Sequence, residues 1–187
     1  MIRHLLAASI AVSALALSTG QALAQPTAFS AIINGAQEVP PRDTPGSGFG
    51  TILILNANTI QVNLSVSNLL TQTSGGDPSA ITVGHIHQGA PGTNGGVVVD
   101  LFAGFTGTGG PGSNFVVINQ TYTGTGVANF VTGAQSGLQY YFNIHSNAFP
   151  GGEVRGNLVA APEPGTLGLL ALGSVAFGVV ARRRMRR

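Results

Sequence analysis

The chain has 187 residues, enough for one domain of ordinary size, and it has no cysteine, which excludes disulfides and thiolate metal sites. All eight basic residues are arginines, and five of them follow residue 181, so the part between the two ends is mildly acidic. This distribution argues against nucleic-acid binding, which requires a basic face to neutralise phosphates.

Residues 1–24 have the features of a cleavable secretory signal peptide. Arg3 supplies the positive start, an apolar run without charges extends from Leu5 to Leu17, and Ala22-Leu23-Ala24 offers small residues at the cleavage site. We therefore expect a signal peptidase to cut before Gln25. The alternative, a permanent N-terminal anchor, fits less well because the apolar run is short for a membrane span.

Residues 25–161 are predicted to form one all-β domain. In residues 60–66, apolar side chains alternate with polar ones, which indicates a strand with one buried face. Glycine- and proline-rich segments separate the strands, and this pattern favours an antiparallel Greek-key β-sandwich or barrel. The predicted strands are 28–33, 50–55, 60–66, 81–87, 97–102, 114–120, 126–131, 138–145 and 153–159.

The C-terminal residues 162–187 combine three features. Pro162, Glu163 and Pro164 precede an uncharged, mostly apolar stretch at 165–181, and an arginine cluster then closes the chain. A helix over 165–181 would be about 26 Å long, near the lower limit for crossing a bilayer core. Arginines favour the cytoplasmic side, so the β domain is expected outside the inner membrane. The cluster consists of Arg182, Arg183, Arg184, Arg186 and Arg187.

This combination closely resembles the PEP-CTERM sorting signal of Gram-negative bacteria. The resemblance implies recognition by an exosortase, cleavage near Pro162-Glu163-Pro164, and delivery to the cell surface or an exopolysaccharide matrix. Before that step the protein would be held in the inner membrane by a single span. The alternative is a plain tail anchor that is never removed.

Four segments of the β domain stand out by their glycine, proline and histidine content: 35–41, 85–98, 143–145 and 150–156. Their order and spacing resemble the CHRD domain, a module named after the developmental protein chordin and also found in bacteria. The resemblance spans roughly Phe29 to Leu158. The chain departs from the family pattern at Gly95-Gly96, where Gly-Pro is expected, and in a glycine-rich insertion at 104–112. The resemblance implies a fold and an exported context more than an activity.

His85 and His87 are candidate metal ligands, together with His145. Two residues apart on a strand, His85 and His87 project to one face with Cβ atoms about 6.5–7 Å apart. Three imidazoles can bind copper or zinc. A His-x-His pair in a β-sandwich also resembles the copper site of copper/zinc superoxide dismutases, although the chain has too few ligands for a dinuclear site.

An alternative interpretation places the histidines in a structural polar cluster. His85 and His87 continue the face of Ile81 and Val83, which would be the core side, where the histidines would be held by hydrogen bonds to the backbone or to a carboxylate. Their expected partners are Glu38, Glu153 and Arg155, which include a buried Arg–Glu pair.

A catalytic interpretation has little support. It would use a histidine as general base, oriented by Glu38 or Glu153, with Ser146 as nucleophile. Ser146 neighbours His145 on a strand, however, so the two side chains point to opposite faces. The aromatic cluster Tyr140-Tyr141-Phe142 is a candidate carbohydrate platform, with Tyr140 and Phe142 expected on the core side and Tyr141 opposite to them.

The sequence therefore predicts an exported, non-enzymatic surface or matrix protein without a cofactor. Its expected partners are signal peptidase and exosortase during processing, the inner membrane transiently, and exopolysaccharide or surface proteins afterwards. The alternative function is a mononuclear copper- or zinc-binding domain that uses His85, His87 and His145.

Overall fold

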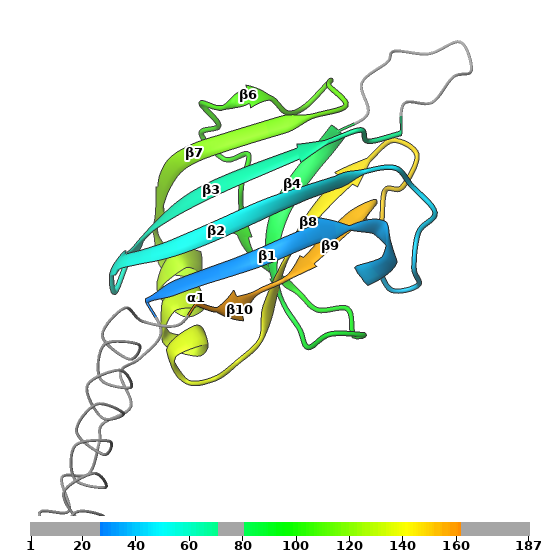
Figure 1. Cartoon of the computed structure of the whole chain (residues 1–187). Coiled ribbons are helices and arrows are strands. Elements are labelled where there is room, and N and C mark those ends of the chain that lie inside the picture. The colour runs from blue at the N-terminus through cyan, green and yellow to red at the C-terminus, as the bar shows by residue number, and fades with distance from the viewer. Residues whose placement is uncertain (1–26, 71–80, 162–187) are drawn as a thin grey trace, which may run out of the picture.

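The computed structural model of the chain describes residues 27–70 and 81–161, which form a curled antiparallel sheet with one α-helix (Figure 1). The predicted signal peptide (1–24), the sorting residues and the predicted membrane helix (165–181) lie outside the described residues. Within the described ranges, no helix combines the length and the apolar character that crossing a bilayer requires.

Ten strands form one sheet, in the order β5-β4-β8-β9-β1-β2-β3-β7-β6, and β10 pairs with β1 beside β9. Every pairing is antiparallel, and the sequence-distant strands β4 and β8 are neighbours. The strands are β1 (Ala28–Asn34), β2 (Ser47–Asn56), β3 (Thr59–Ser67), β4 (Ile81–Gln88), β5 (Val97–Asp100), β6 (Thr108–Gly109), β7 (Val116–Thr123), β8 (Tyr140–Ser146), β9 (Val154–Asn157) and β10 (Val159–Ala160).

The sheet curls into a half-barrel, so that its two halves face each other across the hydrophobic core (Figure 1). The alternation expected for residues 60–66 is confirmed: Ile60, Val62, Leu64 and Val66 are buried. The prediction of a mainly β fold is therefore confirmed. The core is sandwich-like, but it differs from a sandwich of two separate sheets because both of its walls belong to the same continuous sheet.

The strand predicted at 126–131 is wrong, because these residues lie in helix α1 (Thr125–Gln135). The helix buries Val127, Phe130, Val131 and Ala134, which recur at the spacing of one helical face. Phe130 contacts Phe29 of β1 and Tyr140 of β8 through edge-to-face rings whose centroids are 5.9 and 4.9 Å away. The helix therefore closes one end of the curled sheet.

Both ends of the described domain lie at the same end of β1. Phe29 pairs with Ala160, and the Ala161 amide donates to the Ala28 carbonyl. Asn34, at the other end of β1, pairs with Arg155 of β9. The five-residue step from Phe29 to Asn34 corresponds to about 17 Å of strand.

Close packing between the two halves fixes the position of β8. A Cβ atom placed on Gly50 of β2 would lie 2.6 Å from the ring of Phe142, a β8 residue with 0% exposure. The Phe142 ring cannot move aside without disturbing the core around it. Because Tyr141 and Asn143 flank Phe142, this contact also places the outer face of β8.

We predict that Gly50→Ala destabilises the fold by about 1–3 kcal/mol, because the new methyl group overpacks the core against Phe142. Gly96→Ala is the matched control, since a Cβ atom there has nothing within 4 Å. Urea unfolding of both variants measures the difference. Equal stability of the two variants would contradict this description of the core.

Candidate metal centre

A one-residue bulge decides which face of β4 carries the histidines. Ile81 pairs with Ser146 but Val83 pairs with His145, so β4 has one extra residue at this point. After the bulge, Ile86 faces the core, and His85 and His87 face the opposite side of the sheet. The expectation that the histidines share the core face of Ile81 is therefore wrong, because the bulge reverses the alternation.

The outer face carries a row of polar residues, one from each of five neighbouring strands. Register places Asn34 (β1), Arg155 (β9), Asn143 (β8), His85 (β4) and Asp100 (β5) next to one another in that order. Residues directly opposite each other on neighbouring strands project to the same face, so these side chains form a continuous polar strip.

Two loops cover much of this polar face. One contains the 3₁₀ turn η1 (Gly35–Gln37) and continues to residue 46, and the other comprises residues 89–96. The side chain of Asn94 donates to the Val39 carbonyl at 3.0 Å and so joins the two loops. As a result β8 is buried along its whole length, on both faces.

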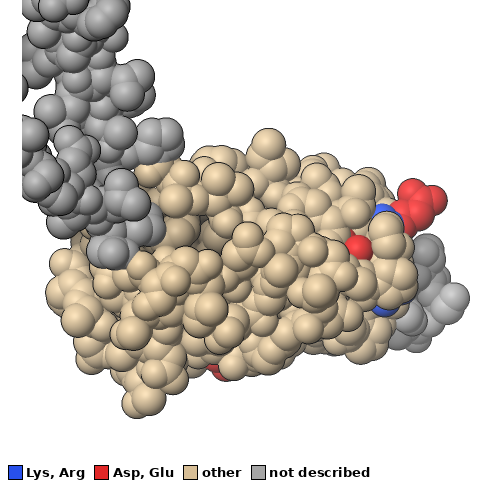
Figure 2. All heavy atoms as spheres, turned by 90° about the horizontal axis from the view of Figure 1, so that it is seen from below, with Lys and Arg blue, Asp and Glu red and all other residues tan. Residues whose placement is uncertain are grey.

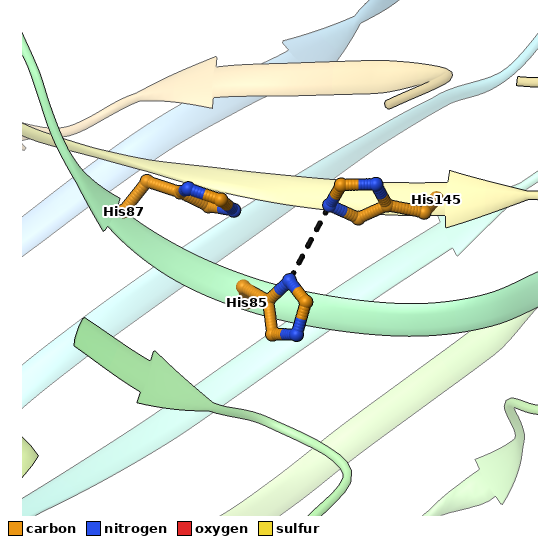
Figure 3. Close-up of side chains that lie close together, drawn as sticks. All are labelled: His85, His87 and His145. Atoms are coloured by element: carbon orange, nitrogen blue, oxygen red, sulfur yellow. Dashed lines mark hydrogen bonds between the residues drawn. The ribbon is translucent and has the colours of Figure 1, made fainter. Parts of the chain in front are cut away.

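The three predicted histidines converge (Figure 3). One ring nitrogen from each of His85, His87 and His145 lies within 4.8 Å of the other two. His85 Nδ1 and His145 Nε2 are 3.3 Å apart. Two nitrogens bound tetrahedrally to one ion, each at about 2.0 Å, are themselves about 3.3 Å apart. The spacing of His85 and His145 already matches that geometry.

Backbone carbonyls fix which nitrogen each ring directs toward the centre. His87 Nδ1 lies 2.9 Å from the Gly95 carbonyl oxygen, and His145 Nδ1 lies 2.9 Å from that of Pro150. A carbonyl oxygen only accepts, so both Nδ1 atoms carry the proton and both Nε2 atoms keep a lone pair. This is the arrangement by which metal-binding histidines are commonly oriented.

The Nε2 lone pairs need a partner at the centre. His87 Nε2 is buried and has no hydrogen-bond partner. His145 Nε2 faces His85 Nδ1, and two lone pairs cannot face each other at 3.3 Å. Either a proton on His85 Nδ1 or a shared cation must join these two nitrogens.

The electrostatic environment keeps the three rings neutral at pH 7. Burial lowers the pKa of His85, His87 and His145 below the usual value of 6.5. The neighbouring histidines lower the pKa of His85 further, while the Asp100 carboxylate raises it. Neutral imidazoles are the form that binds metal ions.

The predicted polar cluster is buried but does not gather at the histidines as a set. Glu153 accepts from the Thr44 hydroxyl at 2.5 Å and from the Leu70 amide at 2.7 Å. Arg155 donates to the Asn157 side chain and to loop carbonyls rather than to a carboxylate. Glu38 is 4% exposed and lies within electrostatic reach of Arg155.

Glu38 is a buried carboxyl with an incomplete set of partners. The Asn143 side chain hydrogen-bonds it, but its Oε1 atom has no partner. Burial raises its pKa from 4.5 to about 7, although the charge of Arg155 opposes this rise. Glu38 therefore takes up a proton near neutral pH.

Sequence reasoning missed several residues of the site and misjudged one. Asn143 and Asp100 flank His85 only through strand pairing, which the sequence does not reveal. Tyr141 is not a surface platform for carbohydrate, because it is 1% exposed and stacks on His87. The aromatic alternation was nevertheless informative, since it placed Tyr141 on the face opposite to Tyr140 and Phe142.

We predict that Glu38 makes the stability of the protein depend on pH. Its folded pKa of about 7 exceeds the unfolded value of 4.5, so its contribution is complete below pH 4.5 and is lost as pH rises through 7. Relative to that of wild type, the free energy of unfolding of Glu38→Gln should rise by on the order of 3 kcal/mol between pH 4.5 and 7.5.

Urea unfolding of wild type and Glu38→Gln at a series of pH values measures this gain. Asp43→Asn, which removes an exposed carboxyl from the same loop, is the matched control. A stability difference between Glu38→Gln and wild type that stays constant across the range would contradict the account of Glu38.

Comparison with known families agrees with the motifs of the sequence. A family model described as the CHRD domain matches residues 29–158, and a model described as the PEP-CTERM protein-sorting motif matches residues 160–186. No curated protein and no solved structure gives a significant match to the chain. Both family resemblances found from the sequence are confirmed.

Proposed function

Because the chain belongs to the CHRD domain family and ends in a PEP-CTERM sorting motif, we propose that it is an exported surface protein whose β domain binds one late first-row transition-metal ion. The sorting motif implies processing by an exosortase and delivery outside the cell. The observation that carries metal binding is the convergence of His85, His87 and His145 with their ligand nitrogens oriented by backbone carbonyls.

The ligand set suits copper or zinc. Imidazole nitrogens bind both ions, and among divalent ions a given nitrogen site generally favours copper. The ligand atoms would be His87 Nε2, His145 Nε2 and His85 Nδ1. His87 and His145 are each 8% exposed, whereas His85 is only half-buried, so an ion would enter on the side of His85.

We further propose that the domain binds rather than catalyses. The nominal nucleophile Ser146 is fully buried, and its hydroxyl accepts from the Phe149 amide at 3.2 Å. Among the residues that the structure describes, few surface side chains are charged, and Figure 2 shows one face almost without them. Such a surface suits contact with uncharged partners, for which exopolysaccharide and other surface proteins are candidates.

The fold separates the three histidines from the end of the domain that leads to the sorting motif. The sorting motif begins at Ala160, which pairs with the start of β1. The polar strip that contains His85 crosses the opposite end of β1, at Asn34. In the membrane-bound precursor the site would therefore lie away from the point of attachment.

We predict that the purified protein, prepared without a histidine tag, binds one copper or zinc ion per chain. His87→Ala and His145→Ala should each weaken binding at least about tenfold, since each removes a ligand. Gln88→Ala, an exposed change on the same strand, is the control and should bind as wild type does. Elemental analysis and competition with a metal chelator measure both quantities.

An ion-free wild-type protein after reconstitution would rule out the metal centre. A structural or adhesive role of the same exported domain would then be the remaining proposal. Turnover of a substrate that disappears in His87→Ala would instead argue against a purely binding role.

We also predict that the mature protein has lost both ends of the chain. Signal peptidase should remove residues 1–24, and exosortase should remove the segment that contains Arg182 and Arg187. Mass spectrometry of the intact protein from the cell surface tests both events. A surface form that still carries the C-terminal arginines would contradict exosortase processing.

A further inference from the structure

Arg155 is a fully buried cation that holds the loop over the histidines. Its Nε donates to Asn157 Oδ1 at 3.0 Å, and its two terminal nitrogens donate to the carbonyls of Thr93 and Ala90 at 2.8 and 2.9 Å. Thr93 and Ala90 both belong to loop 89–96. Arg155, on β9, therefore fixes a loop that is more than 60 residues away in sequence.

Tyr141 connects Arg155 to the metal centre. The guanidinium carbon of Arg155 lies 3.5 Å from the centroid of the Tyr141 ring. The same ring stacks on His87, with centroids 5.0 Å apart and planes inclined by 9°. Because β8 lies between β9 and β4, the tyrosine ring separates the guanidinium from the imidazole.

The loop held by Arg155 returns to His87 through Gly95. The Tyr141 hydroxyl accepts from the Gly95 amide at 3.0 Å, and the Gly95 carbonyl accepts from His87 Nδ1 at 2.9 Å. Gly95 packs directly against the backbone of β4, where no side chain fits, since a Cβ atom there would lie 1.6 Å from the Gln88 carbonyl oxygen. The carbonyl that sets the tautomer of His87 thus depends on Tyr141 and Arg155.

We propose that Arg155 and Tyr141 are positioning residues of the metal centre, which hold loop 89–96 so that the Gly95 carbonyl keeps His87 Nε2 available as a ligand. This inference rests on the proposed metal binding. Arg155 acts through its hydrogen bonds to the carbonyls of Thr93 and Ala90 and through its contact with the Tyr141 ring. Tyr141 acts through its hydroxyl and through its stacking on His87. Residues that orient a ligand in this way typically change metal affinity 10- to 100-fold when mutated.

The test uses two conservative variants of the purified exported protein. Tyr141→Phe keeps the stacked ring and removes only the acceptor for the Gly95 amide. Arg155→Lys keeps the charge and removes the fork that bridges Thr93 and Ala90. Tyr140→Phe is the matched control, because it removes a hydroxyl from the adjacent β8 residue on the core face.

Two readouts separate positioning from simple structural support. Zinc affinity, measured with zinc ion alone by competition, should fall about tenfold in Tyr141→Phe and 10- to 100-fold in Arg155→Lys, but less than threefold in Tyr140→Phe. Nitrogen-15 NMR of the metal-free protein should show His87 protonated at Nδ1 in wild type and in Tyr140→Phe, and a mixture of tautomers in the other two variants.

The inference is overturned if Tyr141→Phe, correctly folded, keeps both wild-type zinc affinity and the Nδ1-protonated form of His87. The predicted loss of zinc affinity in Arg155→Lys would add support. The test rests on Tyr141→Phe, however, so it holds even if Arg155→Lys does not fold. Absence of zinc binding in wild type would instead contradict the proposed function. In that case the tautomer of His87 in the metal-free variants would still test whether Tyr141 positions His87.

Discussion

One extra residue in β4 determines what the outer face of this sheet can do. Ile81 faces the core, and strict alternation would carry His85 and His87 to the same side. The bulge before Val83 reverses the alternation, so that Gly84 and Ile86 fill the core and the imidazoles face outward. Buried among apolar side chains, the rings would have no carbonyl to orient them and no route for an ion.

The outward face then becomes a polar layer between the sheet and its covering loops. Loop 89–96 and the region around Pro150 supply carbonyls to His87 and His145, and the loops exclude water from both rings. Burial lowers the pKa of the rings, and the carbonyls determine the tautomers. Together these effects leave His87 and His145 neutral, with the Nε2 lone pair of each ring directed toward His85, which is the arrangement that the proposed metal ion requires.

The sequence predicted the parts of the site that depend on local geometry. The spacing of His85 and His87 fixed their common face, and alternation placed Tyr141 opposite to Phe142. The convergence of His145 could only be suggested, because it depends on pairing between β4 and β8, which are about 60 residues apart. Arg155 was expected to pair with a carboxylate, but a folded loop offers it carbonyls instead. Helix α1 was missed because its single apolar face is short and is interrupted by glycines.

The central claim is that one ion binds to three imidazoles at this position. X-ray absorption spectroscopy of the copper- or zinc-loaded protein tests it most directly, because it reports the atoms bound to the metal. We expect nitrogen neighbours at about 2.0–2.1 Å with the outer-shell scattering of imidazole rings, accounting for three histidines. A first shell of oxygen atoms without imidazole scattering would contradict the account.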